Sequence, residues 1–90
     1  MSAQKKAANE IWKFVLKDAS PQQLRMPFNS EVVHVAEQNG FVCLWVMVQT
    51  DDCIVSRTFS LYGTGHQIPA DAVYRGTAHV GSFLWHVFEI

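Results

Sequence analysis

The segment FVCLWVMVQ, residues 41–49, decides the fold of this chain. Eight apolar residues follow one another, a run that is too short for a membrane span and typical of a buried strand. Alternate side chains of a strand point to opposite faces, so one face carries Phe41, Cys43, Trp45 and Met47 and the other Val42, Leu44, Val46 and Val48. A strand that is apolar on both faces is covered on both faces. We expect the second cover to come from another subunit or from the N-terminal crossing of the chain.

Turn signals flank this strand on both sides. Asn39 and Gly40 precede it and favour a two-residue hairpin, because both residue types tolerate positive φ. Asp51 and Asp52 follow it and favour another turn. Alternating segments predict four further strands, at residues 31–38, 54–62, 72–80 and 83–90. With a strand near the N-terminus this makes about six strands, which predicts an all-β fold, a small antiparallel sandwich or open barrel.

Two of these strands carry local signals. In 31–38, strict alternation would place Val33 and Val35 on one face and Val32 on the other. In 72–80, a glycine stands inside the apolar pattern, and Gly76 is therefore expected to mark a bulge.

The N-terminal third is less regular. Residues 1–9 are small and polar and predict a flexible tail, which leaves 10–90 as a single β domain. The segment 10–17 fits either a strand or a helical stripe, and we prefer the strand because β-branched and aromatic residues dominate its second half. Pro21 and Pro27 cannot donate ladder hydrogen bonds, so the stretch that contains them is expected to be an irregular crossing.

Composition limits the possible partners and the compartment. Seven basic residues balance eight acidic ones, for a formal net charge of −1. Nucleic-acid binders usually show a basic patch, so the sequence gives no strong signal for nucleic-acid binding. Cys43 and Cys53 lie on either side of a predicted turn; a disulfide is conceivable, but free thiols are preferred because Cys43 lies in the apolar run. The residues near Met1 contain no apolar stretch of the kind that a secretion signal has, and no apolar segment of the sequence is long enough to span a membrane. We therefore expect a reduced, cytoplasmic protein without a membrane segment.

The glycine-rich turn GTGH, Gly63, Thr64, Gly65 and His66, is the most specific candidate for a binding site. Consecutive backbone N–H groups in a tight turn can form an anion-binding nest, and Arg57 or Arg75 could clamp a phosphate bidentately. The plainer interpretation is a connection whose glycines supply positive φ, with Thr64 and His66 bonded to the local backbone. We weigh the plainer interpretation more heavily.

Catalytic and metal sites find little support. His79 and His86 flank the predicted Gly81–Ser82 turn and could face one another, but zinc sites need three or four convergent ligands. No nucleophile lies in a motif such as GxSxG. We predict no metal, no cofactor, no catalytic residue and no enzymatic activity.

The aromatic content exceeds what one small core needs. A contiguous exposed apolar patch marks an interface, and interfaces are enriched in Trp, Phe and Met. The candidate interface residues are Trp45, Phe41, Met47, His86 and Phe88. Self-association as a dimer or higher oligomer is favoured; the alternative is that the N-terminal tail and the proline-containing crossing cover the face.

A resemblance joins several of these segments. The stretches IWKFVL, EQNGFVCLWVMV, RTFSLYGTGHQIP and YRGTAHVGSFLWHVFE resemble a family of small proteins of unknown function encoded by bacteriophages and prophages. The resemblance covers about Ile11 to Glu89, and GTGH and the closing WHVFE are its most specific parts. It implies a bacterial cytoplasm as the setting and no established activity. It also implies that one set of residues matters together: Gly63, Thr64, Gly65, His66, Trp85 and His86.

Three functions remain in competition. The leading hypothesis is a non-enzymatic binding module for a host bacterial protein or a small anionic ligand. The second is a structural or assembly component that forms a homo-oligomer. The third, and the weakest, is an enzyme acting on a nucleotide or phosphoester, with His66 as acid or base and Arg57 or Arg75 as the clamp.

Overall fold

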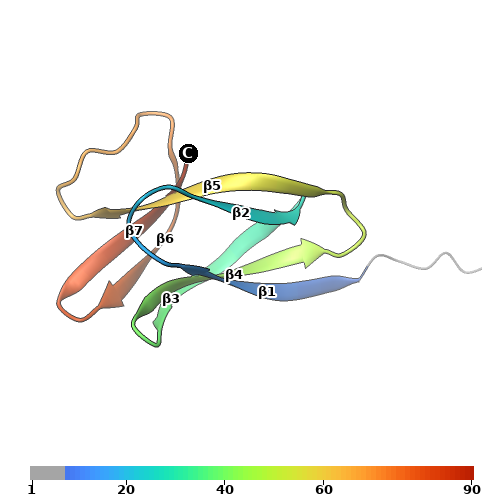
Figure 1. Ribbon diagram of the computed structural model, residues 1–90, viewed down its shortest axis with the longest axis horizontal. Helices are drawn as coiled ribbons and strands as arrows, with labels where there is room; N and C mark the ends of the chain where they lie inside the picture. Colours follow the sequence, from blue (N-terminus) through green and yellow to red (C-terminus); the bar gives the residue numbers. More distant parts are fainter. Residues whose placement is uncertain (1–7) are drawn as a thin grey trace, which may run out of the picture.

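The computed structural model describes residues 8–90, which form two antiparallel sheets packed face to face (Figure 1). A three-stranded sheet has the order β1-β4-β3, and a four-stranded sheet has the order β2-β5-β7-β6. The strands are β1 (Asn9–Leu16), β2 (Gln22–Pro27), β3 (Glu31–Gln38), β4 (Phe41–Gln49), β5 (Ile54–Gly63), β6 (Val73–Val80) and β7 (Phe83–Glu89). The predicted all-β sandwich is confirmed, with seven strands instead of six. The described residues contain no helix that could cross a membrane.

The segment 41–49 is β4, the central strand of the three-stranded sheet. The inner face of β4 contributes four buried residues to a core shared by both sheets. That core consists of Leu16, Met26, Val42, Leu44, Val46, Val48, Phe59, Leu61, Ala78 and Val87. On the outer face of β4, Cys43 is buried whereas Phe41 and Met47 are exposed. The proline-containing crossing does not supply the second cover, because it lies in the other sheet.

The seventh strand is β2, within the stretch that was expected to be irregular. Residues Gln22–Pro27 pair antiparallel with β5 and form an edge of the four-stranded sheet. Pro27 is the last residue of the strand, a position on an edge where its missing N–H leaves no ladder bond unmade. Met26, next to it, is fully buried in the core. The prediction of an irregular crossing was therefore wrong.

The N-terminal strand is confirmed, and the helical alternative is excluded. β1 pairs with β4 along its whole length, from Asn9 opposite Gln49 to Leu16 opposite Val42. Two residues of the predicted tail belong to the sheet: Asn9 begins β1, and the carbonyl of Ala8 accepts the backbone N–H of Thr50 at 3.2 Å. The rest of the predicted tail, residues 1–7, lies outside the described residues.

The β3–β4 hairpin has the turn that its sequence predicts. Asn39 and Gly40 have φ angles of 54° and 85°, as a two-residue turn with both central residues left-handed requires. The alternation expected in 31–38 is wrong, because the register with β4 shifts at Val33. This bulge turns Val32 and Val35 toward the core and leaves Val33 exposed. The bulge predicted at Gly76 is present, as a register shift between Tyr74 and Gly76.

Candidate functional site

The GTGH turn is held by hydrogen bonds of its own. The backbone N–H of His66 donates to the Gly63 carbonyl at 3.1 Å, and the N–H of Gly63 donates to Nδ1 of His66, also at 3.1 Å. Gly65 has a φ of 90°, which residues with side chains rarely adopt. A Cβ on Gly63 would lie 3.0 Å from Cε1 of His66, so the imidazole packs over the bare backbone of that glycine. These contacts explain both glycines and the histidine as parts of a folded connection.

The hydroxyl in this turn reaches another strand instead of the local backbone. Oγ1 of Thr64 lies 3.0 Å from Nε2 of His86, and Nδ1 of His86 lies 3.0 Å from Oγ1 of Thr77. Thr77 in turn shares a hydrogen bond of 2.6 Å with the hydroxyl of Tyr74. A polar chain therefore crosses the outer face of the four-stranded sheet and occupies both nitrogens of the imidazole.

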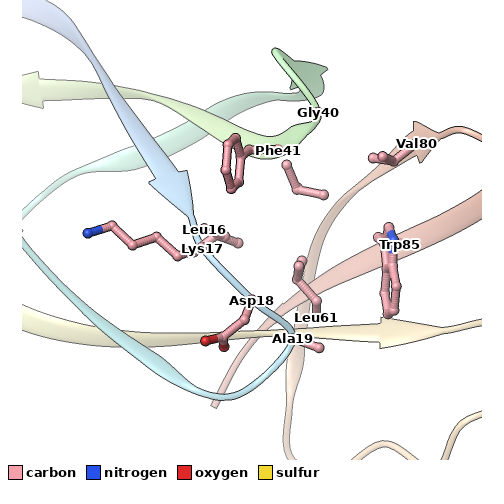
Figure 2. Close-up of a pocket in the computed structure, with 10 residues that line it drawn as sticks. Leu16, Lys17, Asp18, Ala19, Gly40, Phe41, Leu61, Val80 and Trp85 are labelled. Carbon is pink, nitrogen blue, oxygen red and sulfur yellow. The ribbon is translucent and has the colours of Figure 1, made fainter.

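Two adjoining cavities lie at one end of the sandwich. We call this the cavity end; it carries the 17–19 connection and the turns at Asn39–Gly40, Gly63–His66 and Gly81–Ser82. The first cavity has a volume of about 190 Å³ and opens between the two sheets (Figure 2). Its walls are mainly apolar, with Lys17 and Asp18 as its charged members: Leu16, Lys17, Asp18, Ala19, Gly40, Phe41, Val42, Leu61, Val80 and Trp85.

Asp18 helps to shape this cavity. Its carboxylate accepts the backbone N–H of Ser20 at 2.9 Å and also the Ser20 hydroxyl. These two hydrogen bonds hold the pKa of Asp18 below its ordinary value, because they stabilise the charged form. The connection between β1 and β2 is thereby fixed beside the cavity wall.

The second cavity, of about 310 Å³, lies between the GTGH turn and the β6–β7 hairpin. Its lining combines polar and aromatic side chains: Gly63, Thr64, His66, Ser82, Phe83, Leu84 and Trp85. Trp85 lines both cavities. Phe83, whose ring centroid lies 6.2 Å from that of Trp85, is 65% exposed. The cavity end therefore presents an accessible aromatic pair beside two hollows.

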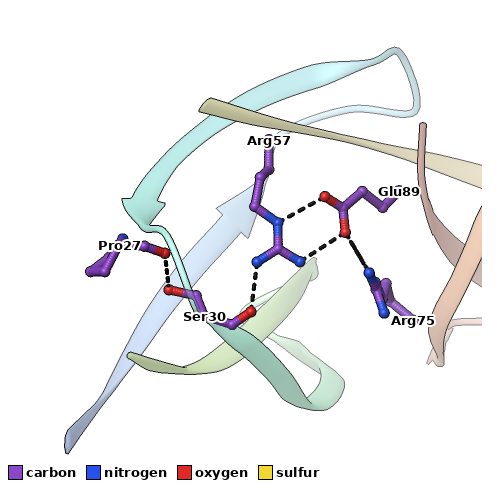
Figure 3. Close-up of polar contacts among 5 residues, drawn as sticks. All are labelled: Pro27, Ser30, Arg57, Arg75 and Glu89. Carbon is purple, nitrogen blue, oxygen red and sulfur yellow. Dashed lines mark hydrogen bonds and ion pairs between the residues drawn. The ribbon is translucent and has the colours of Figure 1, made fainter. Parts of the chain in front are cut away.

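The two arginines predicted as an anion clamp are engaged elsewhere. Arg57 donates to Glu89 through Nε at 2.7 Å and Nη2 at 2.8 Å, and Arg75 donates to the same carboxylate at 2.8 Å (Figure 3). Arg57 also donates through Nη1 to the carbonyl of Ser30 at 2.6 Å. The hydrogen bonds from Arg57, and secondarily those from Arg75, lower the pKa of Glu89, while its partial burial opposes this shift.

The predicted six-residue ligand site is therefore not assembled. Arg57 is six residues before Gly63 along β5, about 20 Å away at a rise of about 3.3 Å per residue. Within the turn, the N–H groups of Gly63 and His66 already have acceptors, which leaves fewer donors for an anion-binding nest. Gly63, Thr64, Gly65 and His66 do lie together, and Gly63, Thr64 and His66 border the second cavity.

The five predicted interface residues divide between opposite sides of the sandwich. Phe41, Trp45 and Met47 lie on the outer face of β4 in the three-stranded sheet. His86 and Phe88 lie on the outer face of β7 in the four-stranded sheet, where Phe88 packs against Tyr62 and Tyr74. They cannot form one contiguous patch on a single copy.

Trp85 and Phe83 were not among the predicted ligand-binding residues, although both line cavities at the cavity end. The alternation of 83–90 places them on one face with Val87, and Val87 is buried in the core. Their proximity to GTGH depends on the pairing of Gly63 with Trp85 across β5 and β7. The resemblance groups Trp85 with the GTGH turn, but a sequence that is analysed strand by strand contains no signal for the register that brings them together.

The cysteines and histidines remain scattered. Cys43 is buried and Cys53 exposed, and both are free thiols, as expected. Within residues 8–90, no three side chains of metal-ligating type converge.

Comparison with known proteins identifies a family whose function is unknown. Residues 7–90 match a domain of unknown function, DUF7352. No curated protein and no solved structure matches the chain.

Proposed function

We propose that this chain, which belongs to the DUF7352 family of domains of unknown function, is a non-enzymatic binding module. Its binding surface is the cavity end, and its partner is a host bacterial protein. The proposal includes a phage or prophage origin, which the resemblance of GTGH and WHVFE to such proteins favours, and a bacterial cytoplasm as the setting.

One observation carries this proposal: Trp85 stands between two cavities, and the exposed rings of Phe83 and Phe41 flank them. Aromatic anchors beside pockets are typical of the energetic centre of protein interfaces. Small-molecule sites usually have about 300–1,000 Å³, and the cavities here, of about 190 and 310 Å³, are at or below that limit. Hollows of this size suit individual apolar side chains of a protein partner.

The charge arrangement favours a protein over a small anionic ligand. Both arginines that could clamp an anion are bound to Glu89, away from the GTGH turn. An anion at that turn would have to be held by donors without a formal positive charge, namely the remaining backbone N–H groups, the hydroxyls of Thr64 and Ser82, and Nε2 of His66, whose Nδ1 accepts the Gly63 N–H. The same separation argues against a phosphoester enzyme built on His66 with Arg57 or Arg75.

Capture from a bacterial lysate tests the proposal. Tagged wild-type protein is expected to retain a host protein, and Phe83→Asp is expected to weaken retention at least tenfold because it places a charge in the apolar contact. Phe28→Asp is the matched control, since Phe28 is 60% exposed and lies at the opposite end beside Cys53. If both variants lose binding equally, or if neither variant loses it, the partner does not bind at the cavity end.

A role in assembly is the second candidate, and the exposed apolar residues on the outer face of β4 favour it. Such a component would form an ordered oligomer larger than a dimer. Light scattering on the purified chain distinguishes this role from that of a monomeric or dimeric binding module.

A further inference from the structure

The edge strands of the two sheets are not equally protected against pairing with another chain. At one side of the sandwich, β3 and β6 lie against one another through Val35 and Gly76, and each carries a bulge. At the other side, β2 has only six residues and ends at Pro27. Short strands, prolines and bulges are the features that keep sheet edges from accepting a further strand. β1 has none of them: its eight residues pair with β4 without a register shift, at the margin of the three-stranded sheet (Figure 1).

One row of backbone groups on β1 points away from β4. Opposite residues of an antiparallel pair alternate between exchanging two hydrogen bonds and exchanging none. The N–H of Thr50 donates to the carbonyl of Ala8, so Ala8 and every second residue after it turn their backbone groups to β4. The residues between them turn their N–H and C=O groups to the open edge. We call these groups the free row; it belongs to Asn9, Ile11, Lys13 and Val15.

The free row ends where the fold itself supplies a partner. Lys17 is the next residue in the same alternation, and its N–H donates to Oε1 of Gln22 at 2.9 Å. Within residues 8–90, no hydrogen bond of this kind reaches the backbone groups of the free row. The chain therefore satisfies the last outward N–H at this edge and leaves the row before it available to an extended segment.

The charged side chain in the free row does not block it. A lysine on an edge strand can repel an added strand. The Nζ of Lys13, however, donates to the amide oxygen of Gln38 at 2.6 Å. Gln38 is on β3, beyond β4, so the ammonium group is directed across the sheet and away from the open edge.

The free row is complementary to a second copy of itself. When a two-fold axis passes beside Trp12, Ile11 of each copy lies opposite Lys13 of the other, and Asn9 lies opposite Val15. Every member of the row then meets another member, and each pair exchanges two hydrogen bonds. The same register keeps the two Lys13 side chains from lying directly opposite one another, which would be unfavourable.

We propose that β1 pairs edge to edge with β1 of a second copy, in an antiparallel register centred on Trp12. This pairing joins the two three-stranded sheets into one continuous sheet. Because each copy contributes its free row to the same contact, assembly stops at a dimer. No residue of the free row lines either cavity, so this dimer and binding at the cavity end can fail separately.

The width of the contact limits the affinity. One pair of strands is a smaller contact than a standard interface, which buries about 800 Å² on each partner. The hydrogen bonds gained at this edge also replace hydrogen bonds to water. We therefore expect a reversible dimer with a Kd of about 10–100 µM.

Amide hydrogen exchange measured by NMR tests the register directly. The N–H groups of Ile11, Lys13 and Val15 are expected to exchange severalfold more slowly at about 1 mM than at about 20 µM, because they gain acceptors in the dimer. The N–H groups of Trp12 and Phe14 are bonded to β4 and should be protected at both concentrations. Over the same range, sedimentation should show the mass rising from the 10.2 kDa of one chain toward twice that value.

A proline substitution removes one donor of the free row without touching the ladder to β4. In Ile11→Pro only the outward N–H is lost, a change that an edge strand tolerates, and Kd is expected to rise at least tenfold. Gln23→Pro is the matched control. The N–H of Phe28 donates to Cys53, so Gln23, in the same alternation, also turns its N–H to an open edge, that of β2. This control should leave Kd unchanged, and circular dichroism confirms that both variants fold.

Several outcomes overturn the proposal. One is a chain that stays monomeric up to 1 mM, about tenfold above the highest expected Kd. Another is a dimer in which the N–H groups of Ile11, Lys13 and Val15 exchange at the same rate as in the monomer. A third is Ile11→Pro that folds and dimerises like the wild type, or that weakens the dimer no more than Gln23→Pro does.

Discussion

Val35 of β3 and Gly76 of β6 approach so closely that a Cβ added to Gly76 would lie 2.5 Å from Cγ2 of Val35. The two residues belong to different sheets, and Gly76 is at the bulge that shifts the register of β6 against β7. The contact therefore closes one side of the sandwich, where the edges of the two sheets meet. A side chain at residue 76 would have to push them apart.

Gly76→Ala is accordingly expected to destabilise the fold. The new methyl group overlaps the branched side chain of Val35, and overpacking of this kind typically costs about 1–3 kcal/mol. Urea denaturation measures the change in the free energy of unfolding.

Removing the obstacle provides the control. Val35→Ala alone leaves a gap and destabilises the fold, but in the double variant Gly76→Ala/Val35→Ala the two changes should partly compensate. Costs that simply add would show that the strain at residue 76 comes from its φ of 156°, not from Val35.

The ion-pair cluster predicts a specific dependence on pH. The pKa of Glu89 is lowered in the folded state, so its stabilising contribution is complete above the ordinary value of 4.5 and is lost as the pH falls through the lowered pKa. Glu89→Gln should reduce the free energy of unfolding by about 2 kcal/mol at neutral pH, since two partly buried guanidinium groups lose a charged acceptor. The difference between the two proteins should shrink in acid.

Denaturation curves recorded between pH 3 and pH 7 (about the range that spans an ordinary glutamate pKa) measure this effect. Arg57→Gln should shift the acid limb of the wild-type profile more than Arg75→Gln, because the hydrogen bonds from Arg57 are the larger cause of the lowered pKa. A gap between wild type and Glu89→Gln that stays constant with pH would contradict the assignment.

The GTGH turn predicts a structural role for its histidine. His66→Ala removes the acceptor of the Gly63 N–H and should lower the free energy of unfolding by about 1 kcal/mol. His79→Ala, at an exposed position, serves as the control. Gly63→Ala should be harmful when His66 is present and less so when it is absent, because the added methyl meets the imidazole. A free energy of unfolding that is unchanged in His66→Ala would contradict this structural role of the imidazole.

The polar chain on the four-stranded sheet can be interrupted at its centre. Thr77→Val keeps the shape of the side chain but removes the hydroxyl that links His86 to Tyr74. The nitrogen resonances of the His86 imidazole are expected to shift in NMR spectra, whereas Thr58→Val, on β5 of the same sheet, should leave them in place. Unchanged resonances in Thr77→Val would mean that the chain is not formed in solution.

The fold was predictable where local chemistry and tertiary packing agree. The apolar run 41–48 predicts the central strand, and Asn39–Gly40 predicts its hairpin, because a buried apolar run and a pair of residues that tolerate positive φ are properties of the local sequence. β2 was missed because Pro27 looks like a strand breaker, and only its position at the end of an edge strand makes it harmless. The bulge at Val33 was missed because one extra residue reverses an alternation without changing the composition.

The candidate site was harder to predict from the sequence, for a different reason. Turn chemistry singled out Gly63 and His66 correctly as neighbours, since they are close along the chain. The proposed partnership with Arg57 ignored the length of the strand between them. Trp85 reaches the turn only through the pairing of β5 with β7, and cross-strand register depends on the whole sandwich.

The pairing of β1 with β4 has a kinetic consequence. Residues 9–16 leave the ribosome before the strand that they need, because Asn9 pairs with Gln49 and not with a residue close in sequence. The β3–β4 hairpin can close first through its two-residue turn, and β1 then docks onto a finished template. Closing that long loop costs entropy before any contact rewards it, so β1 should be among the last of the described strands to acquire protection from hydrogen exchange during refolding.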